Sequence, residues 1–241
     1  MIKGTKSDDV IKILQKIPVN KRNKVQEITL DMAGSMVLIS KTSFPKASLV
    51  TDRFHVQQLA SEAVQEIRIK YRWEALDDEN EAIEDYKNKG LIYKPRILIN
   101  GDTIKQLLAR SRFLLYKHYS KWTETQKERA NILFEYYPDI EKAYNLSQKL
   151  SHIYQNTTEK NIALTKLARW YDEVDKANFK SFNTISRTIQ IHYRTILNYF
   201  DNRSTNASAE SFNAKIKAFR AQFRGVRDIP FFLFRLTKIF A

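Results

Sequence analysis

The chain has 241 residues, contains no cysteine and carries 41 Lys and Arg against 27 Asp and Glu, a net charge of +14. This length allows one large domain or two small ones, and the 43% hydrophobic content excludes a wholly disordered chain. The absence of cysteine excludes a disulfide framework, a Cys-ligated zinc site and a thiol nucleophile. Only five Gly and five Pro are present, which favours a mostly helical protein over sandwiches, barrels and Gly-rich nucleotide-binding folds.

The strong positive charge, together with 12% aromatic residues, favours a polyanionic partner, and nucleic acid is the commonest one. The alternative is a basic surface that serves solubility alone. No apolar run approaches the roughly 18 residues of a membrane span, and the first residues carry no signal-peptide hydrophobic region. We therefore expect a soluble cytoplasmic protein without a membrane partner.

The first fifty residues predict a strand–helix–strand unit. Residues 7–17 form a short helix that Ser7 caps, and residues 25–31 form a strand that ends in Asp31. A helix over residues 32–43 and a Pro-marked turn lead to a second strand, Ser48–Thr51, which is followed by Asp52. Right-handed parallel pairing is the expected geometry.

Both predicted strands therefore close on an aspartate. Active sites of parallel sheets lie at the carboxyl ends of the strands, so Asp31 and Asp52 are candidate catalytic carboxylates. The alternative for each is that it caps the helix that follows. Asp8 and Asp9, at the start of the first helix, are interpreted as residues that complement its dipole.

From residue 54 to residue 200 the periodicity is helical throughout. Residues 53–76 predict one long amphipathic helix, and the charged segment from Glu79 to Asn100, which contains Pro95, is interpreted as a flexible connection. Further helices are predicted over residues 103–119, 123–137, 138–155, 158–174 and 182–200.

The last part joins a polar loop to a very basic helix, which Asn206 or Ser208 would cap and which holds Glu210 in its first turn. An apolar stripe along this helix predicts a core-facing side: Phe212, Ile216, Phe219 and Phe223. Basic residues crowd the same segment and predict phosphate contacts with duplex DNA, without strong sequence preference. They are Lys215, Lys217, Arg220, Arg224 and Arg227.

The order of these elements resembles a DDE transposase of bacterial insertion sequences, of the ISL-three type. The segments that carry the resemblance are LDMAGSM, FPKASLVTDRFHV and STNASAESFNAKIKAFRAQFRGVRD. They correspond to a strand-terminal Asp, to the family's FP-x-A-x-x-V-x-D-R-F-H-V block and to its TN-x-x-x-E-x-x-N-x-x-I-K block with a basic run after it. The resemblance covers nearly the whole chain.

The resemblance implies an RNase-H-like core in which three carboxylates bind divalent metal ions, Mg²⁺ or Mn²⁺, to cut and join the ends of the insertion sequence. It makes Asp31 the second acid and Glu210 the third, both as metal ligands. Asp52 and His55 then form the D-x-x-H motif that follows the second acid. The other assignment, with Asp52 as the second acid, stays open.

The implied fold class is α+β and mostly α: a partial RNase-H-like core, built on a parallel strand–helix–strand unit, that a large all-helical insertion interrupts. The expected domains are the partial core over residues 1–56, the helical insertion over residues 57–204, and a basic C-terminal helix over residues 205–241 that completes the core. Expected partners are DNA at insertion-sequence ends and either a second copy or a full-length transposase, in a bacterial, nucleoid-associated setting.

The family's first acid would stand on a strand ahead of those predicted here, and Asp8 and Asp9 are poor substitutes for it. The expectation is therefore an N-terminally truncated transposase that is inactive alone, with its metal site in doubt and its status as an enzyme left open. The alternatives are a non-catalytic DNA-binding transposase remnant and an unrelated helical protein that binds nucleic acid.

Overall fold

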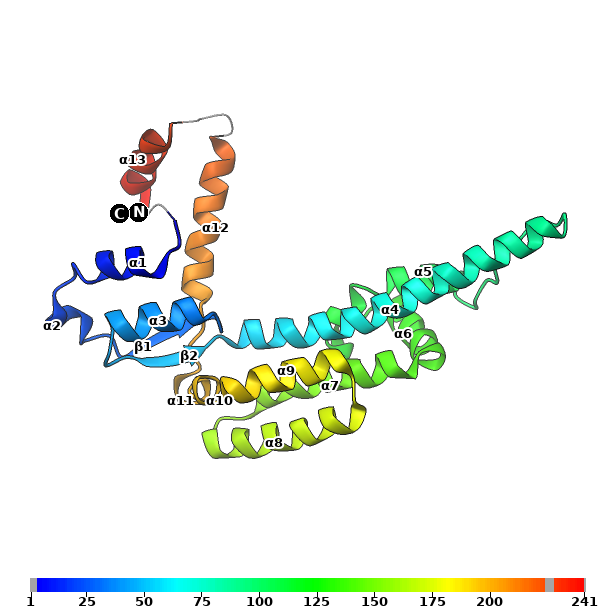
Figure 1. Ribbon diagram of the computed structural model, residues 1–241, viewed down its shortest axis with the longest axis horizontal. Coiled ribbons are helices and arrows are strands. Elements are labelled where there is room, and N and C mark those ends of the chain that lie inside the picture. Colours follow the sequence, from blue (N-terminus) through cyan, green and yellow to red (C-terminus); the bar gives the residue numbers. More distant parts are fainter. Residues whose placement is uncertain (1–3, 224–227, 241) are drawn as a thin grey trace. The chain divides into compact units, whose positions relative to one another are not determined.

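The computed structural model describes residues 4–223 and 228–240, and the chain divides into two compact units. Unit 1 combines residues 1–53 with residues 194–241, and unit 2 is residues 54–193. Figure 1 shows the elements in sequence colours. The described residues are mostly helical and contain one pair of parallel strands, which confirms the predicted α+β, mostly α class.

Unit 1 is built on the two strands β1 (Glu27–Leu30) and β2 (Ser48–Thr51), joined by helix α3 (Gly34–Ser43). The strands pair in parallel, with Leu30 opposite Thr51, as the sequence predicts. Helix α3 packs on β1, and helix α1 (Ser7–Leu14) packs on α3. A short helix, α2 (Val19–Arg22), lies between α1 and β1.

Two details of this region differ from the sequence expectation. Helix α1 follows Lys6, and no side chain caps it, so the assignment of Ser7 as its cap is wrong. The helix also ends at Leu14, so Ile17 lies beyond it and is exposed. The remaining apolar residues, Val10, Ile11 and Leu14, are half-buried. These three residues form the apolar side of α1, which packs against α3.

The second part of unit 1 follows the helical region. The predicted helix over 182–200 is broken into α9 (Lys180–Ile191), α10 (Tyr193–Leu197) and α11 (Tyr199–Asn202), and the boundary between the units falls at the start of α10. Helices α12 (Ala207–Gln222) and α13 (Ile229–Phe240) complete unit 1.

Unit 2 is a helical assembly with its own core. Its helices pack in sequence order, α5 on α6, α6 on α7, α7 on α8 and α8 on α9. Short loops join α6, α7, α8 and α9, which favours such neighbouring antiparallel packing. The elements are α4 (Arg53–Asn88), α5 (Ile104–Arg110), the 3₁₀ turns η1 (Leu114–Tyr116) and η2 (Tyr119–Lys121), α6 (Glu124–Tyr136), α7 (Pro138–Asn156) and α8 (Lys160–Ala177).

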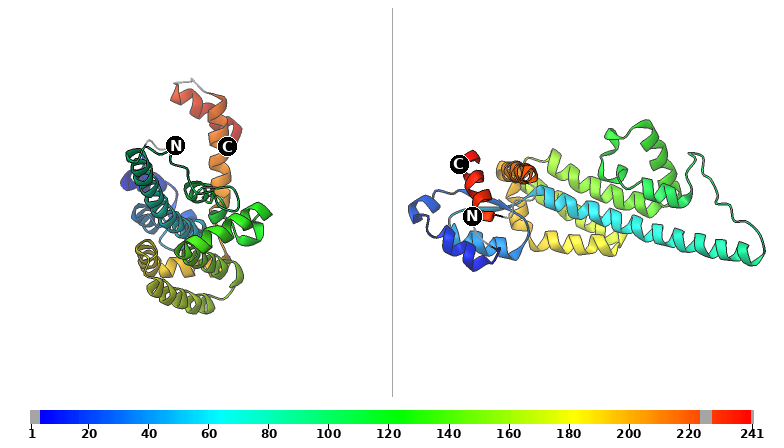
Figure 2. Two further views of the ribbon diagram at one scale, coloured as in Figure 1. Left: turned by 90° about the vertical axis from the view of Figure 1, so that its right-hand side faces the viewer. Right: turned by 90° about the horizontal axis from the view of Figure 1, so that it is seen from above.

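The long helix α4 corrects one sequence expectation. Residues 79–88, interpreted as part of a flexible connection, continue the helix without a break to Asn88. Their composition explains the result, because Glu79, Glu81, Ala82 and Glu84 are good helix formers and Pro95 stands seven residues beyond the helix end. The right-hand view of Figure 2 shows α4 as the longest helix of unit 2.

Candidate active site and nucleic-acid interface

The parallel register brings two aspartates to the same end of the strand pair. Leu30 lies opposite Thr51, and the backbone N–H of Asp52 donates a hydrogen bond of 3.0 Å to the carbonyl oxygen of Leu30. The ladder thus continues one residue past β2. Asp31 and Asp52 therefore follow neighbouring strands at their carboxyl ends, the edge where parallel sheets place their functional side chains.

The carboxylate of Asp31 is half-buried and partly engaged. Its Oδ1 accepts a hydrogen bond of 3.0 Å from the backbone N–H of Ala33, which shapes the turn into α3. Within residues 4–223 and 228–240, its second oxygen accepts no hydrogen bond. Asp31 therefore fixes the turn with one oxygen only, which is compatible with both the capping and the catalytic interpretation of a strand-end aspartate.

Asp52 and His55 lie on either side of the junction between β2 and α4. The side chain of Asp52 is only 2% exposed and follows the buried Thr51. His55 is half-buried in the first turn of α4, and its ring contacts that of Phe54 edge-on, with centroids 5.9 Å apart. Asp52 is therefore buried at the end of the strand pair and is not presented at the surface.

Polar side chains of α10, of α11 and of Asn198 between them hold the returning chain against the strands. The side-chain amide of Asn198 donates to the carbonyl oxygen of Leu49 at 2.9 Å and to the hydroxyl of Ser48 at 3.2 Å. The hydroxyl of Thr195 lies 2.7 Å from that of Thr51, and Asn202 donates to Glu27 Oε2 at 2.9 Å. Sequence reasoning missed these residues, because polar residues in a helical run do not specify which distant group they bond to.

Glu210 lies in the first turn of α12 and is exposed. Asn206 stands at the N-cap as one of the two predicted caps, but its side chain makes no capping hydrogen bond. In the described parts of the chain, no three Asp, Glu or His side chains come together as a group that could hold a metal ion. The convergence of Asp31 and Glu210 is therefore still a prediction.

Helix α12 presents its basic residues to solvent. The side chains of Lys215, Lys217 and Arg220 are all exposed, whereas the predicted contacts Arg224 and Arg227 lie outside the described residues. On the apolar stripe Phe219 is buried, with ring centroids 4.6 Å from Phe223 and 5.5 Å from Phe232 of α13. Phe212, predicted to face the core, is 45% exposed, because α13 covers only the later part of the stripe.

Unit 2 contains a buried carboxylate, Asp102, that forms ion pairs with two arginines. Asp102 is 1% exposed and forms ion pairs with Arg110 and with Arg129, the latter at 3.0 Å from Nε to Oδ2. Burial alone would raise the pKa of Asp102, but the hydrogen bonds from Arg129 and Arg110 outweigh it, so the pKa lies below its ordinary value. The cluster joins α5 and α6 to the loop that precedes them.

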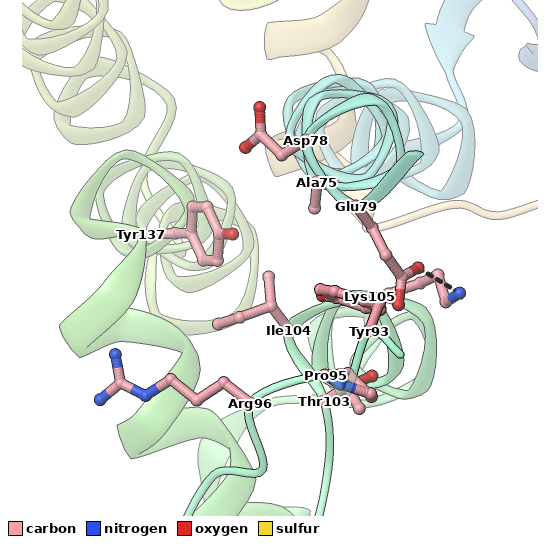
Figure 3. Close-up of a pocket in the computed structure, with 10 residues that line it drawn as sticks. All are labelled: Ala75, Asp78, Glu79, Tyr93, Pro95, Arg96, Thr103, Ile104, Lys105 and Tyr137. Carbon is pink, nitrogen blue, oxygen red and sulfur yellow. Dashed lines mark ion pairs between the residues drawn. The ribbon is translucent and has the colours of Figure 1, made fainter. Parts of the chain in front are cut away.

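A pocket of about 210 Å³ opens beside this cluster, between α4, the segment after it and α5. Figure 3 shows Glu79 of α4 turned toward Lys105 of α5, with which it forms an ion pair. Ile104 and Tyr137 face each other across the cavity in the same view. Both acidic residues (Asp78 and Glu79) and basic residues (Arg96 and Lys105) line the pocket, so its charge does not favour an anionic or a cationic ligand.

Comparison with protein families matches residues 1–236 to the family of DDE transposases of the ISL3 (ISL-three) type, described as transposases. The match covers almost the whole chain, so the protein belongs to this transposase family and its function is DNA transposition as a component of insertion sequences. Searches of curated proteins and of solved structures found no match.

Membership confirms the resemblance on which the sequence interpretation depended. Transposases of this family bind DNA, and DDE transposases generally use divalent metal ions. The helices of the described residues include none that is long and apolar enough to cross a membrane.

Proposed function

We propose that unit 1 carries the chemistry of DNA cutting and joining at insertion-sequence ends, with Asp31 and Glu210 as the carboxylates that bind Mg²⁺ or Mn²⁺. The observation that carries the proposal is the register of β1 and β2, which sets Asp31 beside Asp52 at one strand edge. Carboxylates are the ligands that hard divalent cations prefer. Bound cations of this kind activate a water or a 3′-hydroxyl and stabilise the leaving oxygen.

In this proposal different residues of unit 1 have different roles. Asp31 and Glu210 hold the cations, and His55, with the buried Asp52, braces the strand edge next to them. Glu210 belongs to the same compact unit as the strands, and Asn198 and Thr195 fasten the chain that leads to it. The helical unit 2, which the chain inserts between β2 and α12, serves the assembly of the transposase at DNA ends.

The exposed cations of α12 are proposed to contact phosphates of duplex DNA. Lys215, Lys217 and Arg220 follow Glu210 within three turns of the same helix, so DNA held by them lies near that carboxylate. Contacts of this kind position the duplex and are weakened by salt.

The metal proposal is tested by Mn²⁺ binding to the full chain, followed by electron paramagnetic resonance. We expect Asp31→Asn and Glu210→Gln each to weaken Mn²⁺ binding by about tenfold or more, since each removes a charged ligand. Asp8→Asn, which changes an exposed acid of α1, is the matched control and should leave binding unchanged. The comparison of Asp31→Asn with Asp52→Asn decides which aspartate is the second acid. Wild-type Mn²⁺ affinity in both Asp31→Asn and Glu210→Gln would overturn the proposal.

A further inference from the structure

The segment between α5 and η2, residues 111–118, is fixed to the helices of unit 2. Leu114 and Leu115 of η1 are each 1% exposed and anchor the segment in the core. Three side chains donate hydrogen bonds to its backbone carbonyl oxygens: Gln65 to Arg112 at 3.1 Å, Trp122 to Leu114 at 2.8 Å and Tyr144 to Lys117 at 2.8 Å. Packing and hydrogen bonds therefore hold the backbone of this segment in one conformation.

Two aromatic rings of this segment face solvent. Phe113 is 68% exposed and Tyr116 is 46% exposed. Residues three apart in a 3₁₀ turn lie on the same side of it, so the two rings share the outer side of η1 while Leu114 and Leu115 face the core. Both side chains are thus accessible to a ligand that offers a flat surface.

Arg68 of α4 places a buried positive charge next to this segment. It is 4% exposed, and its guanidinium donates to Gln65 Oε1 at 2.7 Å and to the carbonyl oxygen of Leu108 at 2.8 Å. In the parts of the chain that the structure describes, no Asp or Glu pairs with it. Burial of a charge without an opposite charge is costly, so an anion bound at this surface would stabilise Arg68.

Two exposed arginines add to this charge beside the rings. Arg72 lies one turn after Arg68 on the same face of α4, and the guanidinium of Arg112 lies 5.5 Å from the centre of the Phe113 ring. Burial, together with the charges of Arg72 and Arg112, lowers the pKa of Arg68, and the nearby Tyr116 opposes this shift. The three arginines and the two rings therefore form one cluster.

The surrounding sequence supplies cations and no acids. Residues 103–121 contain five Lys and Arg and no Asp or Glu. Two of the five pair with acids from other segments of unit 2. The exposed Arg112 and Lys117 form no ion pair within residues 4–223 and 228–240, and neither does Arg72 of α4. The cluster thus favours an anion, and its rings favour an anion that carries flat groups.

We infer that this surface, here called the aromatic platform and formed by Arg72, Arg112, Phe113 and Tyr116, binds single-stranded DNA. Unpaired bases stack on the two rings, and the arginines neutralise the adjacent phosphates. Bases in a duplex are paired and stacked on one another, so a duplex contacts the cations alone and leaves both rings exposed. The choice of DNA as the anion rests on the role in transposition, whereas the platform is independent of the metal residues proposed in unit 1.

The first test is fluorescence anisotropy of the full chain with labelled oligothymidine and with a labelled duplex, both in EDTA. The variant Phe113→Ala, Tyr116→Ala should weaken binding of oligothymidine by about tenfold or more, because stacking on both rings is lost, and should leave duplex binding unchanged. The matched control, Tyr86→Ala, Tyr136→Ala, removes two exposed rings of α4 and α6 and should change neither affinity. Because EDTA removes metal ions, this result does not depend on Mn²⁺ binding in unit 1, and the two proposals can fail separately.

The second test measures the contribution of the arginines. The variant Arg72→Gln, Arg112→Gln should lower the slope of log K for oligothymidine against log salt by about 1.4, near 0.7 for each phosphate that is no longer neutralised. The variant Arg169→Gln, Arg187→Gln makes the same change in charge at exposed sites of α8 and α9 and should keep the wild-type slope.

The variant Phe113→Trp reports on stacking directly and keeps an aromatic ring at this position. Oligothymidine should quench the fluorescence of the added indole, and the duplex should not. Absence of quenching, or an equal loss of single-strand and duplex binding in the ring variant, would overturn the inference. Unchanged single-strand binding in the ring variant, the result expected if the platform binds an acidic protein instead, would overturn it as well.

Discussion

The two units differ more in charge than in size. Unit 1 carries 19 Lys and Arg against 8 Asp and Glu, a net charge of +11, whereas the larger unit 2 carries 22 against 19, a net charge of +3. The seven carboxylates of residues 74–85 account for most of this contrast. The unit that holds the strand-end aspartates is thus the unit whose field attracts a polyanion.

The units also differ in how they are held together. Unit 2 has a continuous apolar interior that includes Leu107, Leu150 and Trp170, all nearly inaccessible to solvent. Unit 1 has two four-residue strands and a smaller apolar interior, and side-chain hydrogen bonds from α10 and α11 join its two chain segments. Unit 2 therefore depends on packing, and unit 1 depends on packing together with a few polar contacts.

The largest expected effect is in the core of unit 2. Trp170 is 2% exposed, and its indole N–H donates to the carbonyl oxygen of Leu146 at 2.9 Å. We expect Trp170→Ala to lower the free energy of unfolding by about 3–5 kcal/mol, since it removes a large buried ring and leaves a cavity. Hydrogen exchange followed by mass spectrometry should show faster exchange in peptides of α7 and α8. Equal acceleration in β1 and β2 would show that the two units do not unfold separately.

The next effect concerns the buried carboxylate of unit 2. Asp102→Asn should cost about 2–4 kcal/mol near neutral pH, because it leaves Arg110 and Arg129 without their charged partner. The pKa of Asp102 is lowered in the folded protein, so the stabilisation is present above the unfolded carboxyl pKa of about 4 and is lost as pH falls through the folded value.

Urea unfolding of wild type and Asp102→Asn at several pH values measures this difference. The gap in free energy should shrink below about pH 4. The exposed Asp172→Asn, on α8, is the control and should stay within about 0.5 kcal/mol of wild type. If the difference in free energy of unfolding between wild type and Asp102→Asn did not change with pH, the ionised carboxylate of Asp102 would not be the source of the stabilisation.

A smaller effect is expected at the polar contacts of unit 1. Asn198→Ala removes hydrogen bonds to Leu49 and Ser48 and should cost about 1–2 kcal/mol. Asn131→Ala, at an exposed position of α6, should change stability by less than about 0.5 kcal/mol. Thermal unfolding of both variants provides the comparison, and equal stabilities would show that Asn198 does not hold the returning chain to the strands.

The sequence predicted the strand pair well because its signal is local. A Pro-marked turn precedes β2, which the structure places at Ser48–Thr51 as predicted, and Asp52 follows it. Alternation marks β1, which is shorter than the predicted 25–31 and ends at Leu30. The Asn198 contacts were not predictable, because they join residues about 150 positions apart and nothing in the helical pattern specifies the partner. The last part of α4, residues 79–88, was missed because charge was taken as a sign of flexibility, although glutamate favours helix.

At the candidate site, too, local features could be predicted from the sequence and contacts between distant segments could not. Parallel pairing of the two strands follows from the strand–helix–strand order, so the position of Asp31 and Asp52 at one end of the strand pair could be predicted. The position of Glu210 relative to that edge depends on how α12 packs, which no short-range pattern in the sequence specifies. Phe212 illustrates this, since its helical spacing predicts burial and only the placement of α13 leaves it exposed.

The central claim is that unit 1 holds the DNA, and salt-dependent binding tests it most directly. Affinity for duplex DNA should be measured across salt concentrations for two triple variants. The unit 1 variant combines Lys215→Gln, Lys217→Gln and Arg220→Gln. The unit 2 variant, the control with the same change in charge, combines Lys121→Gln, Lys142→Gln and Lys176→Gln. All six side chains are exposed. We predict that the unit 1 variant lowers the slope of log K against log salt by about 2–3, near 0.9 for each phosphate that the protein no longer neutralises, while the unit 2 variant keeps the wild-type slope. Equal slopes for the two variants would contradict the claim.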